Sequence, residues 1–296
     1  MIAQGQKAPY ALLAPTNNPV VADGSIPLHN STVSPPGPPI HAEVGRYRLR
    51  LAEGAADRVA ACRLRFRVFN IELGEGLESS YATGIDSDHF DIFCEHLLVE
   101  DKSVGRVVGT YRMQSGTTAG MNFGYYSEQE FEFAPYEPLR RDILELGRAS
   151  IDREHRSPEV LTLLWRGIAQ YANEMGLRYL VGCSSLTSKE PEEGWQMYRE
   201  LARYRVSPEF ETVPTAGYEC PTEQAVANAQ QHAAGEDCTL PTKVPKLLKT
   251  YLAIGARICA PPAWDRKFGT IDFLTLLDLK MLSSAARNRF MAPLTQ

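Results

Sequence analysis

The segment ELGRASIDREHRSPEVLTLLWRG, residues 145–167, constrains the fold more than any other part of the chain. Its first residues read as a strand, and beyond a short loop the apolar residues recur at helical spacing, which predicts a helix over residues 158–175. Ser157 suits the N-cap, Pro158 the first turn and Glu159 the positive end of the helix dipole. This strand, loop and capped helix predict an α/β unit whose helix N-terminus either binds a phosphate or is simply well capped.

The loop before that helix differs from most phosphate-binding loops because it contains no glycine. Its backbone would approach a large pyrophosphate less closely, so a single phosphodiester is the ligand that we expect there. The predicted phosphate contacts are the residues at the helix N-terminus and the cations beside it: Arg153, Arg156, Ser157, Glu159 and Val160.

Strands and helices on either side of this unit predict one mixed α/β domain. Strands are expected at YRLRLAE, EHLLVED, VGRVVGTYRMQ, DILELGRASI, RYLVGC and within RICAPPAWDRKFGTIDFLTLLDL, and helices at residues 55–74, 190–204 and 243–255. Residues 1–44 hold eight of the 20 prolines and few charges, which predicts a flexible arm before a folded domain over residues 45–296. Residues 221–241 read as a polar insertion in that domain.

Composition excludes several classes of function. A net charge of −5 argues against a general nucleic-acid binder. No apolar run is long enough for a transmembrane helix, and the first residues lack the basic start and apolar stretch of a signal peptide. Six cysteines without a C-x-x-C pair argue against a zinc site and against a disulfide framework, which leads us to expect a cytoplasmic protein with reduced thiols and no metal.

Two charged residues of the predicted strand carry the first hint of chemistry. Glu145 and Arg148 have opposite parity, so a regular strand would point them to opposite faces. Gly147 between them permits a β-bulge that would bring both to one side. A structural ion pair is the simpler interpretation of these residues, and of Arg65 and Arg112 as well.

Several motifs in one order resemble a known group of enzymes. LRFRVF, DSDHFD, EHLL, GTYR and ELGRASI are similar to the acyl-homoserine-lactone synthases and their relatives. LELGRASIDREHRS, LLWRGIAQY, YLVGCSS and the C-terminal PKLLKTYLAIGARICAPPAWDRKFGTIDFLTLLDL resemble more closely the L-ornithine N-alpha-acyltransferases, the hemolysin-like proteins of ornithine-lipid synthesis. The resemblance covers residues 46–296 and implies an α/β fold of the GNAT acyltransferase type, a central mixed sheet flanked by helices.

The resemblance also implies roles for particular residues. The enzyme would transfer a fatty or 3-hydroxy fatty acyl group from acyl carrier protein to the α-amine of an amino acid such as ornithine. The donor would be a phosphopantetheine thioester, with no permanently bound cofactor. Residues that match the family's functional positions and would hold the amine substrate are Arg65, Asp88, Asp91 and Arg112, with Phe69 beside them. Glu145 and Arg148 match its strand pair.

Amide formation from a thioester needs a neutral amine and a stabilised oxyanion. Because the α-amine has a pKa of about 8, a general base is useful, and Glu145 acting through a water is the candidate. Backbone N–H groups at Ala149 and Ser150, just past the bulge, would polarise the thioester carbonyl. An apolar tunnel for the acyl chain is expected around Phe69, Leu97 and Trp165, although a plain core explains the same residues.

An acidic carrier protein would require a basic docking patch. The candidates are Arg140, Arg141, Arg153, Arg156 and Arg166. The basic, amphipathic helix at residues 243–255 is compatible with peripheral contact at the inner face of the cytoplasmic membrane, but a core helix with a solvated edge is the favoured interpretation. Two alternatives stay open: an acyl-homoserine-lactone synthase using S-adenosylmethionine, and a non-catalytic acyl- or carrier-binding protein.

Overall fold

The structure is a computed structural model that describes residues 37–221 and 243–291. Its centre is a nine-stranded mixed sheet in the order β1-β2-β3-β4-β5-β6-β9-β7, with β8 paired to β9. All neighbouring strands are antiparallel except β5 and β6, which are parallel. The strands are β1 His41–Val44, β2 Tyr47–Leu51, β3 Glu95–Asp101, β4 Arg106–Ser115, β5 Ile143–Ile151, β6 Tyr179–Leu186, β7 Arg257–Ile258, β8 Ala263–Asp265 and β9 Thr270–Asp278.

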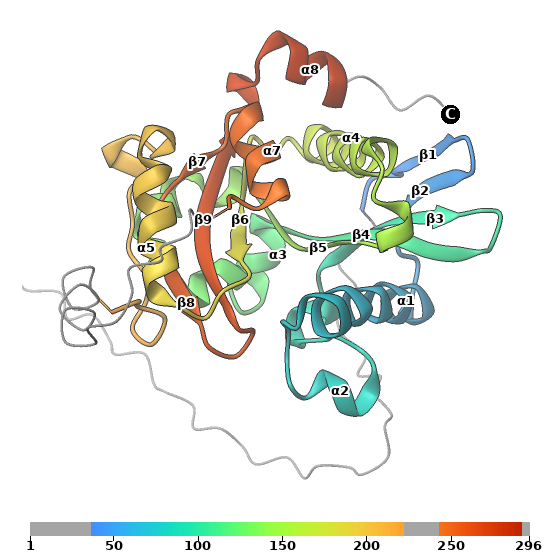
Figure 1. The fold of residues 1–296 in the computed structure, drawn as a ribbon. Coiled ribbons are helices and arrows are strands. Elements are labelled where there is room, and N and C mark those ends of the chain that lie inside the picture. The colour runs from blue at the N-terminus through green and yellow to red at the C-terminus, as the bar shows by residue number, and fades with distance from the viewer. Residues whose placement is uncertain (1–36, 222–242, 292–296) are drawn as a thin grey trace, which may run out of the picture. The chain divides into compact units, whose positions relative to one another are not determined.

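Helices cover both faces of this sheet (Figure 1). The α-helices are α1 Ala55–Phe66, α2 Ser80–Thr83, α3 Gly116–Met121, α4 Pro158–Glu174, α5 Pro191–Glu200, α7 Lys246–Ile254 and α8 Ser284–Phe290. A π-helical stretch, Arg67–Leu73, continues α1, and a 3₁₀ turn, η3 Tyr126–Gln129, follows α3. None of the described helices is both long and apolar enough to cross a membrane.

Because side chains alternate along a strand, the apolar core forms on both faces of the sheet. Leu97 of β3 packs with α4, and its neighbour Leu98 packs with α1 on the other side of the sheet. Helix α4 approaches closely because Gly167 has no side chain: a Cβ there would lie 2.9 Å from a Leu97 methyl group. We call the two sides of the sheet the α4 face and the α1 face.

The predicted elements agree with the structure except at its margins. Helix α4 begins at Pro158 with Ser157 as N-cap, and the Ser157 hydroxyl accepts a 3.4 Å hydrogen bond from the Val160 N–H. The sheet begins at His41 rather than near Gly45, because β1 pairs with β2 as a short edge hairpin. Helix α8 was not predicted. Most of the arm, residues 1–36, and nearly all of the polar insertion, residues 222–242, lie outside the described residues.

Candidate active site

Strands β5 and β6 part in the middle of the sheet. They pair only over Ile143–Glu145 and Tyr179–Val181, although both strands continue beyond that point. Where they part, Gly182 lets the backbone of β6 approach the backbone of β5 closely, because a Cβ at that position would lie 2.2 Å from the Leu146 carbonyl oxygen. The open segment of each strand therefore has no strand partner on that side, and its backbone groups are available to a ligand.

A β-bulge follows in β5, where the sequence predicted one. The register of β5 shifts by one residue between Thr110 and Arg112 of β4. Arg148, inside the bulge, has a φ of 52°, a left-handed conformation that costs a non-glycine residue energy. The bulge turns the Arg148 side chain to the α1 face, where Glu145 also points, so this part of the prediction is confirmed.

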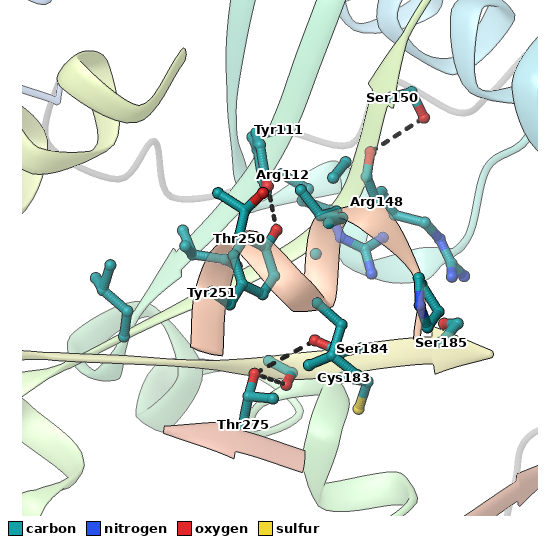
Figure 2. Close-up of a pocket in the computed structure, with 18 of the residues that line it drawn as sticks. Tyr111, Arg112, Arg148, Ser150, Cys183, Ser184, Ser185, Thr250, Tyr251 and Thr275 are labelled. Atoms are coloured by element: carbon teal, nitrogen blue, oxygen red, sulfur yellow. Dashed lines mark hydrogen bonds between the residues drawn. The ribbon is translucent and has the colours of Figure 1, made fainter. Parts of the chain in front are cut away.

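A cavity of about 910 Å³ occupies the gap between β5 and β6. Its wall includes Cys183 and Ser185 on the α1 face of β6 and Ser184 on the α4 face, so the cavity passes through the sheet (Figure 2). Exposed residues line it on both sides of the sheet: Ser185 on the α1 face, and Lys246 and Arg289 on the α4 face. Two ligands can therefore enter from opposite faces and meet at the gap.

Glu145 lines this cavity and is 5% exposed. Its Oε1 accepts hydrogen bonds from the Ser127 N–H at 2.7 Å and the Ser127 hydroxyl at 2.6 Å, and its Oε2 accepts one from the Tyr126 N–H at 2.8 Å. Burial raises the pKa of Glu145, against the hydrogen bonds from Ser127 and Tyr126, which lower it. The carboxylate is thus held rigidly, is more basic than usual, and keeps lone-pair capacity on Oε2.

Three arginines and three aspartates form a closed ionic network beside Glu145. Arg65 is fully buried, with Nε 2.7 Å from Asp86 and Nη1 2.6 Å from Asp91. Arg112 Nη1 donates to Asp88 at 2.6 Å and to Asp91 at 3.2 Å. The network closes through Arg148, whose Nη2 donates to Asp88 at 3.1 Å.

Each aspartate of the network is paired with at least one arginine, so its negative charge is neutralised. Burial alone would raise the pKa of Asp91, but Arg65 and Arg112 outweigh it and hold that pKa well below its usual range. Of the four residues predicted to hold the amine, only Arg112 lines the cavity, and Arg65, Asp88 and Asp91 stand behind the wall. They position Arg112 and Arg148, and their carboxylates are already neutralised by arginine.

The residues predicted to bind phosphate lie around the N-terminus of α4, but not all face the cavity. Arg156 and Ser157 line it, and Arg156 also pairs with Glu72. The Val160 side chain is fully buried in the core, and its N–H is already capped by Ser157. Arg153 and Glu159 are exposed and lie outside the cavity lining.

The apolar arm of the cavity lies on the α4 face. Trp165 packs against Tyr251 and Phe290, with ring centroids 5.4 Å and 5.6 Å apart, and all three line the cavity. Phe69 lines the cavity too, carried there by the π-helical stretch. Leu97, also predicted as a tunnel residue, is fully buried in the core beneath α4 and is not among the residues that line the cavity.

The predicted basic patch does not form one surface. Arg140 and Arg141 precede β5, whereas Arg153 and Arg156 follow it, so the strand separates them by about 30 Å. Arg140 is also engaged with Glu128 and Glu137. The cations that do line the cavity come from separate elements: Lys246 and Arg289 lie on the α4 face, and Arg156 precedes α4 and pairs with Glu72 of the π-helical stretch.

The sequence analysis missed a group of buried acids on the α1 face. Glu130, Asp265 and Asp272 line the cavity and are between 1% and 3% exposed. Glu75, 6% exposed, lines it near them and accepts a hydrogen bond from Thr187. One signal was available: Asp272 interrupts the apolar strand TIDFLTLLD, and a charged residue in such a run is rarely buried without a function.

Comparisons with known proteins agree with this architecture. The acetyltransferase (GNAT) domain family matches residues 64–166. The L-ornithine N(alpha)-acyltransferase of Brucella abortus is 31% identical over 269 residues, which cover 85% of this chain and 93% of that protein. The enzyme of the same name from Rhizobium meliloti is 29% identical over 286 residues, 91% of this chain and 93% of that protein.

Among solved structures, FeeM, an N-acyl amino acid synthase from uncultured soil microbes, matches with a TM-score of 0.46 and 13% identity, covering 84% of this chain and 97% of that chain. The AHL synthase LasI matches with a TM-score of 0.43 and 14% identity over 84% of this chain and 97% of that chain. The sequence identity to the acyltransferases over most of both chains decides the assignment. With its GNAT domain and mixed sheet, this chain belongs to the L-ornithine N(alpha)-acyltransferase family.

Proposed function

We propose that this protein transfers a fatty acyl group from the thioester of an acyl carrier protein to the α-amine of an amino acid such as ornithine. The product would be an N-acyl amino acid, or a lyso-ornithine lipid when ornithine is the acceptor. The observation that carries the proposal is the cavity between β5 and β6, with the buried carboxylate of Glu145 in its lining. Four relatives with 28–31% identity are named L-ornithine N(alpha)-acyltransferases, which supports the acyl transfer and the acceptor but not the choice of donor.

The acceptor amine approaches from the α1 face. Glu145 points to that side and takes the amine proton, through a water, from the free lone-pair position on its Oε2. Arg112 and Arg148 line the same part of the cavity, and although the network balances their charge, their guanidinium N–H groups would donate hydrogen bonds to the substrate carboxylate. Arg148 is held for this role between the faces of Tyr126 and Phe268, 4.9 Å and 4.4 Å from their ring centroids.

The donor approaches from the α4 face. Its phosphate meets the N-terminus of α4 at Ser157 with Arg156, and Arg153 and Glu159 stand at the exposed rim. Its acyl chain lies in the apolar arm beside Trp165. We place the thioester carbonyl at the bulge, where Arg148 and Ala149 have no register partner in β4. The Ala149 N–H would stabilise the oxyanion, whereas Ser150, also predicted for this role, pairs with Thr110 of β4.

A product assay tests the proposal. Purified protein is incubated with acyl-carrier-protein thioesters of several chain lengths and with ornithine, lysine, glycine and tyrosine, and the products are identified by mass spectrometry. We expect an N-acyl amino acid whose formation requires both substrates. Parallel reactions with acyl-coenzyme A and with S-adenosylmethionine test the donor and the lactone-synthase alternative, and no N-acyl product from any pair would refute the proposal.

A further inference from the structure

Three buried carboxylates meet at the α1-face end of the cavity. Glu130 follows the 3₁₀ turn η3, Asp265 ends β8, and Asp272 lies on the neighbouring strand β9. One carboxylate oxygen from each lies within 4.8 Å of the others, and all three residues line the cavity. Chain segments more than a hundred residues apart therefore place three acids around one point.

Two of these acids present free oxygens to the cavity. The two residues are 1% and 3% exposed, and with both ionised neither Oε atom of Glu130 nor the Oδ1 of Asp272 has a hydrogen-bond partner. A proton shared between the two carboxyl groups and the weak Cys183 thiol donor are the contacts that a bound cation would replace. Asp265 differs, since its Oδ1 accepts the N–H groups of Lys267 and Phe268 at 2.9 Å each, which fixes the β8–β9 turn. Buried polar atoms without a partner are costly and rare, so three on two adjacent carboxylates indicate a missing ligand.

Basic side chains of the described residues do not neutralise these carboxylates. Within the described residues, none of the three is in an ion pair with a lysine or arginine, in contrast to the aspartates of the network around Arg65. Burial raises the pKa of Glu130 well above its usual range, and the charges of Asp272 and Asp265 add to this effect. A cation bound among them would relieve both the burial and the mutual repulsion.

We infer that Glu130, Asp265 and Asp272 bind the side-chain ammonium group of a diamino acid acceptor while its α-amine lies at Glu145; the inference rests on the proposed function. An ammonium group has three N–H donors, and the cluster offers three free oxygens. Glu145 and the cluster are neighbours along one wall: the Ser127 hydroxyl donates to Glu145 at 2.6 Å, and the Cys183 thiol, 3.5 Å from that hydroxyl, lies beside Glu130. Glu145 and the cluster would then bind the two amino groups of one diamino acid.

A divalent cation is the competing ligand for three carboxylates. Hard cations require about six oxygen ligands, several of them commonly water, whereas an ammonium group is satisfied by three acceptors. The aromatic rings of Tyr126 and Phe268 occupy the neighbouring wall, and the Tyr126 hydroxyl donates to Asp265 at 3.5 Å, an arrangement suited to an alkyl ammonium group lying against an aromatic wall. The geometry therefore favours the organic cation, and the metal is tested as a separate outcome.

The experiment compares ornithine with norvaline, which has the same carbon chain without the terminal amine. Variants Glu130→Gln and Asp272→Asn keep size and hydrogen-bonding capacity but remove charge, and exposed Glu132→Gln is the control on the same loop. We expect kcat/KM for ornithine to fall about tenfold or more in the two cluster variants, with little change for norvaline or in the control. Equal losses for both acceptors, or no loss for either, would overturn the inference.

Direct binding separates this inference from the proposed function. Calorimetric titration with ornithine and norvaline, without any acyl donor, should show ornithine binding that the cluster variants lose. If wild-type protein binds ornithine in this way but makes no product, the proposed function fails and the cluster assignment stands. If it acylates ornithine and norvaline equally, the assignment fails and the function stands. Tight binding of Mg²⁺ or Mn²⁺ that Glu130→Gln abolishes, with ornithine turnover intact, also overturns the assignment.

Discussion

At the scale of single residues, burial separates two kinds of acid in this protein. Asp86 and Asp91 are fully buried and paired with arginine, so they act as parts of the scaffold. Glu145 is buried with hydrogen-bond donors but no cation within ion-pair distance, and it stays basic. Removing one partner of a buried ion pair is strongly destabilising, so variants of the network report on folding, whereas variants of Glu145 report on chemistry.

Glu145 should govern the acidic limb of the pH profile. Its pKa is raised by burial, so the base is lost as the pH falls through a value above the ordinary glutamate range. We expect Glu145→Gln to lower kcat by about 10²–10⁴-fold and to flatten that limb. Steady-state rates between pH 5 and 9 measure the effect, with exposed Glu174→Gln as the control. A variant that kept both its rate and its pH limb would remove Glu145 from the mechanism.

The ionised Asp272 carboxylate should destabilise the ligand-free protein above about pH 6. Burial raises its pKa to about 6, with the charge of Asp265 adding to the shift, so the folded state binds a proton that the unfolded state has lost. Stability therefore falls as the pH rises from about 4 to about 6. We expect Asp272→Asn to raise Tm by about 2 °C or more at pH 8 and by less at pH 5, measured by differential scanning calorimetry. An equal change at both pH values would contradict this account.

At the scale of elements, the bulge in β5 sets the direction of the Arg148 side chain in the candidate site. It turns Arg148 toward Asp88 and opens the strand edge beside β6. The cost is a left-handed backbone at Arg148, which glycine would adopt freely.

Two substitutions at Arg148 separate backbone strain from lost charge. Both Arg148→Ala and Arg148→Gly remove the guanidinium group, but only glycine relieves the positive φ. We expect the glycine variant to be more stable than the alanine variant by about 1 kcal/mol in urea unfolding. The same pair at exposed Arg63, in the last turn of α1, should give the opposite order because alanine favours a helix. The same order at both positions would show that strain at the bulge is negligible.

Local patterns made some elements predictable and left others hidden. Helix α4 was predictable because its cap, its first-turn proline and its apolar spacing all lie within one segment. The bulge was predictable because Gly147 separates two functional residues of opposite parity. Short edge elements such as β1 and α8 carry too few residues for a period to show. Asp265 and Asp272 share the local hairpin of β8 and β9, but Glu130 comes from the segment after η3, more than a hundred residues earlier, and no local pattern encodes their meeting.

At the scale of the described domain, charge is distributed across the cavity with opposite signs on its two sides. Lys246 and Arg289 line it on the α4 face, and the carboxylate cluster lies on the α1 face. Since a carrier protein and its phosphate are anionic and a diamino acid is cationic, this distribution favours one binding side for each substrate.

Charge reversal on the α4 face should affect the donor alone. We expect Lys246→Glu combined with Arg289→Glu to raise KM for the acyl-carrier-protein thioester about tenfold at low ionic strength, and less at high ionic strength. KM for ornithine should stay within about twofold because the acceptor enters from the other face. Lys280→Glu, exposed and away from the cavity lining, is the control. An equal rise in both KM values would contradict separate entrances.

The gap between β5 and β6 also determines the kinetic order of the reaction. Since the cavity passes through the sheet, neither substrate must leave before the other arrives. Cys183, a thiol in the cavity wall on β6, has its pKa raised well above normal by burial and by the charge of Glu130, so we expect it to stay a neutral thiol rather than accept the acyl group. Initial-rate plots should therefore intersect, as in a ternary-complex mechanism, and parallel lines would indicate a ping-pong reaction instead. Because β5 and β6 stay paired at one end and part at the other, an anionic donor and a cationic acceptor could meet within the sheet while each stays on its own face.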